Sequence, residues 1–138
     1  MIMDAMTTLE AFYAAEAAFL TEGAGFEEMA RHLADDIVMD QAPSLPYGGR
    51  WQGHAGFRDF LTAMEASWDG LWFDEQRFLA EGDRIVVYSR GRLRARRTGR
   101  VLETSLLQWI SFRDGLITEF RPYYHDTAAV LAVLSEEA

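Results

Sequence analysis

The residues with the clearest chemical potential lie at the end of a compact apolar segment, residues 37–41. A carboxylate among apolar neighbours has a raised pKa, so Asp40 could act as a general base. Side chains alternate along a strand, however, and this parity places Gln41 rather than Asp40 on the face of Ile37 and Met39. Asp40 could therefore also point outward or pair with an arginine, and the segment alone leaves both roles open.

Other polar groups that could hold a ligand are an amide and several phenols. Gln108 lies in the middle of an apolar strand face, where its amide must find partners. It could fix a ligand carbonyl or hydroxyl, or it could bond to Gln41 or to a tyrosine. Tyr13, Tyr47, Tyr123 and Tyr124 offer hydroxyls, and Tyr47 lies in a loop expected to border the mouth of a cavity. Each tyrosine could equally be a core aromatic with a solvated hydroxyl.

Composition removes several other chemistries. The chain has 138 residues and no cysteine, which excludes thiolate nucleophiles, dithiol redox motifs and thiolate metal sites. Three scattered histidines lack the spacing of a metal site, so we expect no metal and no other cofactor. A net charge of -9 argues against binding to nucleic acid or to an anionic membrane. The arginines between residues 90 and 100 could meet a phosphate, but their alternating spacing favours pairing with acids of a neighbouring strand.

The elements that must position these groups follow from periodicity. Residues 7–10 predict a capping box that starts a first helix, and a short second helix is expected over residues 26–33. A third helix opens at Gly53 and carries an apolar stripe at helical spacing, namely Phe57, Phe60, Leu61, Met64 and Trp68. From residue 71 the period changes to two, which predicts strands at 71–80, 85–95, 101–113 and 116–124. A last helix is expected to end near residue 134.

This order predicts one α+β domain over residues 1–138, with an antiparallel meander after the helices. No signal-peptide pattern and no apolar run of membrane-spanning length is present, so we expect a cytoplasmic protein. Leu107 and Trp109 fall on what should be the outer face of the sheet. An exposed apolar pair of this kind predicts a homodimer through that face.

The chain resembles the SnoaL-like branch of the nuclear transport factor 2-like superfamily over nearly its whole length. The segments that carry the resemblance are residues 33–38, 45–49, 51–56, 113–115 and 120–129. The resemblance implies a cone-shaped, cystatin-like fold, in which a curved antiparallel sheet wraps around helices and the third helix closes over the concave side. It does not imply one reaction, because the superfamily includes isomerases, cyclases, hydrolases and dehydratases.

Ketosteroid isomerases share this fold and allow a comparison position by position. Their general-base aspartate falls on Gln41, which cannot accept a proton at neutral pH, and a slip of one residue would place Asp40 there. Their oxyanion-hole aspartate falls near Gln108. Their tyrosine on the first helix falls near Ala17, one helical turn from Tyr13.

We therefore expect a largely apolar pocket for a small hydrophobic, oxygen-bearing ligand. The expected catalytic residues are Asp40 as base, with Tyr13 or Gln108 as hydrogen-bond donor. The expected substrate-binding residues are Gln41, Tyr47, Phe57, Leu61, Met64 and Tyr123. Two functions remain open: a cofactor-independent cyclase, isomerase or hydrolase, and a ligand-binding or dimerisation module without turnover.

Overall fold

The computed structural model describes residues 4–135, so residues 1–3 and 136–138 of the predicted domain lie outside the described residues. Its elements are α1 (Ala5–Glu22), α2 (Phe26–Ala30), β1 (Leu33–Gln41), β2 (Gly49–Gln52), α3 (Gly53–Ser67), β3 (Trp68–Glu81), β4 (Arg84–Ala95), β5 (Val101–Arg113), β6 (Leu116–Tyr124) and α4 (Thr127–Ser135). Within residues 4–135, no helix has the length and apolar character needed to cross a membrane.

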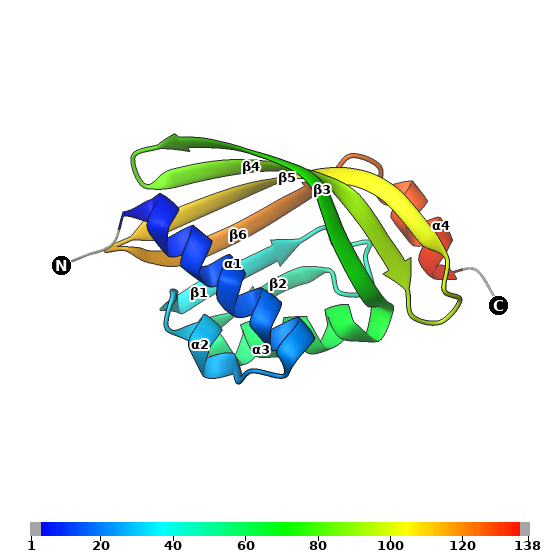
Figure 1. Cartoon of the computed structure of the whole chain (residues 1–138), viewed down its shortest axis with the longest axis horizontal. Helices are drawn as coiled ribbons and strands as arrows, with labels where there is room; N and C mark the ends of the chain where they lie inside the picture. The colour runs from blue at the N-terminus through cyan, green and yellow to red at the C-terminus, as the bar shows by residue number, and fades with distance from the viewer. Residues whose placement is uncertain (1–3, 136–138) are drawn as a thin grey trace.

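One sheet of strand order β2-β1-β6-β5-β4-β3 forms the body of the molecule. The four long strands β3 to β6 pair antiparallel, as the period-two segments predicted. Strand β1 joins the meander by pairing parallel with β6, while β2 pairs antiparallel with β1 at the edge. The long strands arch over α1, and α3 lies farther below (Figure 1). The predicted α+β fold with a curved sheet around helices is confirmed.

The bend of the sheet has a local cause in β3 and β4. The register of this strand pair shifts between Phe73 and Glu75, which marks a bulge, and bulges bend and twist a strand. Gly91 of β4 lies opposite the shift, and a Cβ atom there would collide with the backbone carbonyl of Trp72. The absence of a side chain at position 91 therefore allows the two strands to approach each other at the bend.

Several predicted boundaries were wrong. Asp4 caps α1, since its Oδ1 accepts a hydrogen bond of 2.8 Å from the backbone N–H of Thr7. Thr8 is fully buried and donates instead to the carbonyl of Gly115 at 2.7 Å, so the predicted capping box does not form. Helix α2 stops at Ala30, and β1 begins as early as Leu33.

The core lies where both long helices meet the sheet. The rings of Phe12 on α1, Phe57 on α3 and Phe120 on β6 form a triangle with centroid separations of 5.2, 5.9 and 6.1 Å. All three side chains are at most 2% exposed. Burial of a side chain of this size contributes roughly 1.5–3 kcal/mol, and the tilted contacts add to it. This cluster fixes both helices on the concave side of the sheet.

Candidate functional site

A cavity of about 750 Å³ lies between the concave face of the sheet and the helices α1 and α3. Most of its wall is apolar and comes from the aromatic cluster and its neighbours: Phe12, Met39, Phe57, Phe60, Leu61 and Phe120. Its outer part reaches β3, where Leu71 and Phe73 are 40% and 47% exposed. The volume lies within the range of roughly 300–1,000 Å³ typical of small-molecule sites.

Polar groups enter this apolar wall at a few positions. Those on the helices and the middle of the sheet include Tyr13 and Glu16 on α1, Gln41 on β1, Gln76 on β3, Gln108 on β5 and Tyr124 on β6, and further polar or charged residues of the wall are Glu65, Asp69, Ser89, Arg92, Arg96 and Thr104. Two of them follow a core residue of the same element by one structural repeat: Glu16 lies one helical turn after Phe12, and Gln41 lies two residues after Met39. The elements that build the core thereby also aim these side chains into the cavity.

Glu16 is the carboxyl group of the cavity with a strongly altered acidity. Burial raises its pKa from the ordinary 4.5 to about 7. Burial also raises the pKa of Tyr13, and the neighbouring Glu16 carboxylate raises it further, so Tyr13 keeps its proton at neutral pH. The pair combines a carboxyl that can both take and release a proton with a phenol that keeps its proton and can donate it in a hydrogen bond.

The hydroxyl of Tyr124 is held by a buried network. It lies 2.9 Å from the hydroxyl of Tyr47, which accepts a hydrogen bond of 3.1 Å from the indole N–H of Trp68. Burial raises the pKa of Tyr124 well above its ordinary value, and the contact with Tyr47 raises it further. Tyr47 itself is fully buried and orients Tyr124 from behind the cavity wall.

Sequence reasoning placed some of the expected residues in this cavity. Tyr13, Gln41, Gln108, Phe57, Leu61 and Met64 line it. Asp40 does not, because it lies on the opposite face of β1 from Gln41 and reaches Arg121 at 3.5 Å. Its predicted role as base has no support in the cavity geometry.

Two of the expected tyrosines also lie elsewhere. Tyr47, expected at a cavity mouth, is a core residue with no exposed surface, because its loop folds inward under Trp51 and Phe60. Tyr123 is 57% exposed on the outer sheet face, since its neighbours Pro122 and Tyr124 occupy the inner face. Strand parity counted from Phe120 would have identified Tyr124 as the inward tyrosine.

Glu16 is a candidate functional residue that sequence reasoning missed. A glutamate on an amphipathic helix is typical of a solvated face, and no residue near it in the sequence contradicts that interpretation. The cavity that it lines is built from several elements, including strands more than fifty residues away in the chain. The available signal was its spacing, one turn after Phe12 and next to Ala17.

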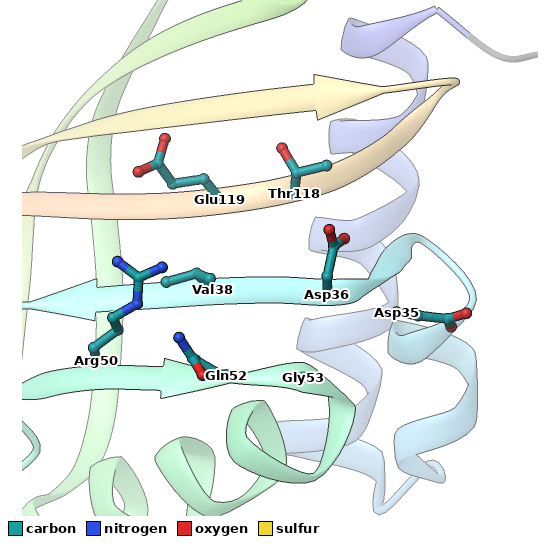
Figure 2. Close-up of a pocket in the computed structure, with 8 residues that line it drawn as sticks. All are labelled: Asp35, Asp36, Val38, Arg50, Gln52, Gly53, Thr118 and Glu119. Carbon is teal, nitrogen blue, oxygen red and sulfur yellow. The ribbon is translucent and has the colours of Figure 1, made fainter.

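A second hollow of about 610 Å³ lies on the outer side of β1, β2 and β6. Figure 2 shows its charged side chains on neighbouring strands, with Asp36 on β1, Arg50 on β2 and Glu119 on β6. The acids there already have partners, since Asp36 pairs with Arg113 at 2.7 Å and Glu119 pairs with Arg121 at 2.8 Å. These solvated ion pairs are typical of a protein surface, so we assign the candidate site to the inner cavity.

Among residues 4–135, no three histidine or acidic side chains gather closely enough to hold a metal ion.

Comparison with known proteins gives one family match and many similar folds. The model of the SnoaL-like domain matches residues 9–120. No curated protein shows significant sequence similarity to the chain. A nuclear transport factor 2-like protein of unknown function from Burkholderia pseudomallei has a TM-score of 0.83 at 22% identity, over 98% of this chain and 100% of that one.

Two further structures carry names that bear on function. TerC, co-crystallised with polyporic acid, has a TM-score of 0.78 at 23% identity, over 94% of this chain and 98% of that one. A protein of Xanthomonas campestris pv. campestris, provisionally named a polyketide cyclase, has a TM-score of 0.75 at 23% identity, over 95% and 96% of the two chains. Identities this low establish a shared fold.

The raised pKa of Glu16 predicts a pH-dependent stability. The pKa of Glu16 is 4.5 in the unfolded chain and about 7 in the folded protein. Its contribution to stability is therefore fully present below pH 4.5 and is lost as the pH rises through about 7. Above pH 7 we expect Glu16→Gln to exceed the wild type by about 2 kcal/mol in free energy of unfolding, allowing for partial contact with solvent. At pH 4 the difference should be much smaller.

Urea unfolding at pH 4, 6 and 8 measures this difference. Glu10→Gln, an exposed glutamate of the same helix, serves as the control and should change little at any of these pH values. A difference between wild type and Glu16→Gln that does not vary with pH would contradict the assignment.

Proposed function

The chain belongs to the SnoaL-like domain family, and from this premise we propose that its inner cavity binds a small, hydrophobic, oxygen-bearing compound. The observation that carries the proposal is the cavity itself, about 750 Å³ with aromatic walls and a small number of polar groups. Stacking and burial against Phe12, Phe57 and Phe120 would supply affinity. The amides, phenols and carboxyl would supply orientation.

The neighbours of known structure agree with a ligand of this class. TerC was co-crystallised with polyporic acid, an aromatic compound that carries several oxygens, and another neighbour is provisionally named a polyketide cyclase. Polyporic acid is therefore a suitable first probe. The alternative function is binding of such a compound without turnover. A catalytic function requires, in addition, a side chain in the cavity that can transfer protons.

Glu16 is the observation that favours catalysis. In its carboxylate form it would take a proton from a carbon next to a ligand carbonyl, and the electron pair of that bond would move onto the carbonyl oxygen. Tyr13 or Gln108 would donate a hydrogen bond to the resulting enolate. In an isomerase step the protonated Glu16 would then return the proton to another carbon of the enolate. In a cyclase step the enolate carbon would instead attack a second carbonyl of the same ligand, forming a carbon–carbon bond, and Glu16 would give its proton to the resulting alkoxide; neither step needs a cofactor.

We further propose that the outer face of the sheet forms a homodimer. Leu107, Trp109 and Tyr123 are 47%, 41% and 57% exposed, and Leu107 lies directly across from Tyr123. The guanidinium of Arg84 lies 5.6 Å from the Trp109 ring. A patch of apolar rings and leucine bordered by arginines resembles the buried centre and polar rim of a protein interface.

The binding proposal predicts stabilisation by polyporic acid. At a free concentration of about 100 Kd, a ligand that binds the native state adds about 2.7 kcal/mol, seen as a rise in Tm. Ala17→Trp should abolish this rise because the indole would fill the cavity from α1. Ala14→Trp, exposed on the same helix but outside the cavity wall, should retain it. No rise for the wild type, or equal rises for both variants, would contradict the proposal.

The catalytic proposal predicts proton exchange on a simple probe. We expect the wild type to accelerate deuterium incorporation next to the carbonyl of 2-tetralone in D₂O, followed by NMR. Glu16→Gln should slow this exchange by about 100-fold or more, because the general base is lost. Glu10→Gln should retain the wild-type rate. If Asp40→Asn stops exchange while Glu16→Gln does not, Asp40 is the base and the assignment of Glu16 is wrong.

The dimer proposal predicts twice the monomer mass in solution at micromolar concentration. Trp109→Glu should shift the protein to a monomer, since a carboxylate at the centre of an apolar interface loses its hydration. Thr62→Glu, exposed on α3, should leave the mass unchanged. Light scattering after gel filtration distinguishes the two states, and a monomeric wild type would end the proposal.

A further inference from the structure

The inner face of the sheet carries three carboxamides, and two of them lack partners. The amide of Gln76 donates a hydrogen bond of 3.1 Å to the hydroxyl of Ser89. The side-chain oxygen of Gln41 is completely buried, and no described residue pairs with it. The side chain of Gln108 likewise forms no hydrogen bond with the rest of the described chain. Gln41 is only 4% exposed and is one of the residues that line the cavity.

The register of the sheet places these two amides on either side of one residue. Gln108 of β5 lies directly opposite Pro122 of β6. Met39 of β1 is level with Phe120 of β6, and the two strands run parallel, so Gln41 is level with Pro122. Gln41 and Gln108 are therefore two strand spacings apart, about 10 Å at the backbone.

The protein does not offer hydrogen bonds to these amides from the strand between them. Pro122 has no N–H group and presents ring carbons to the cavity. On one side of Pro122 the next residues of the inner face are Phe120 and Ile110, which are both buried and apolar, and on the other side the hydroxyl of Tyr124 is engaged with that of Tyr47. The buried side-chain oxygen of Gln41, left unpaired in such surroundings, is costly, whereas Gln108 is half-buried; a molecule inside the cavity would give both amides a partner.

We infer that Gln41 and Gln108 anchor a flat ligand through hydroxyl groups on its two opposite edges, with the ring system lying over Pro122. A hydroxyl both donates and accepts, so it can pair with either end of an amide. An ether or a ketone only accepts and would leave the buried oxygen of Gln41 unpaired. This inference rests on the proposed binding function and adds the ligand class, a fused-ring diol or a compound with the same edge chemistry.

Two matched probes test the inference, 2,6-dihydroxynaphthalene and 2,6-dimethoxynaphthalene, with Kd measured by calorimetry. The wild type should bind the diol at least tenfold more tightly than the diether, since two hydrogen bonds distinguish them. Gln41→Met and Gln108→Met keep the side-chain volume and remove the amide. Each should reduce the preference, and the double variant should bind both probes about equally. Gln52→Met, an exposed glutamine of β2, should keep the full preference.

The outcomes separate the inference from the function on which it rests. Equal binding of diol and diether by the wild type overturns the inference and leaves the binding function in place. A preference for the diol that survives in the double variant also overturns it, since other groups then recognise the hydroxyls. Absence of binding for both probes overturns the binding function and the inference together. The comparison of probes on the wild type needs no variant, so it holds even if a methionine variant fails to fold.

Discussion

The contact on which the rest of the structure depends is the triangle of Phe12, Phe57 and Phe120. It joins α1, α3 and β6 at ring separations of 5.2 to 6.1 Å and closes one end of the space between helices and sheet. Beyond this cluster, the next inward-facing residues of α1 and α3 line the cavity. One turn beyond Phe12 comes Glu16, and one turn beyond Phe57 comes Leu61. A packing constraint therefore sets which residues become the wall of the site, because the same periodicity that buries the rings aims their successors into the hollow.

Much of the fold could be predicted from the sequence because its long strands alternate strictly and end at glycine turns. The segment 85–95 is an example, with Ile85 and Val87 buried on one face and Arg90 exposed on the other. The short strand β2 could not be predicted, because it has four residues, two of them polar, and its pairing partner is β1 rather than a neighbouring period-two segment. The start of α1 was misplaced because Asp4 and Thr7 are both good caps, and burial of Thr8 decides between them.

The residues of the candidate site likewise fall into those that local patterns predict and those that they do not. Residues set by local periodicity, such as Gln41, Gln108 and Leu61, were found from parity and helical spacing. Glu16 was not found, because its raised pKa comes from burial in the folded chain, which the local helical pattern does not reveal. The alternation of side chains along residues 37–41 also argued against Asp40 as a cavity residue, and Asp40 does lie on the outer face with Arg121. Long-range burial, rather than residue type, separates the carboxylate with altered acidity from the one in a surface ion pair.

The polar groups of the cavity have a cost that apolar residues would avoid. An unpaired buried amide at position 41 and a carboxyl that loses stability above neutral pH both disfavour the empty fold. Methionine or leucine at position 41 would pack against Met39 and Phe120 without that penalty. A wall optimised for stability alone would therefore be uniformly apolar. The groups that depart from this, Glu16, Gln41 and Gln108, are those that a bound hydroxylated molecule would pair, so the binding of such a molecule would remove the penalty that the empty cavity carries.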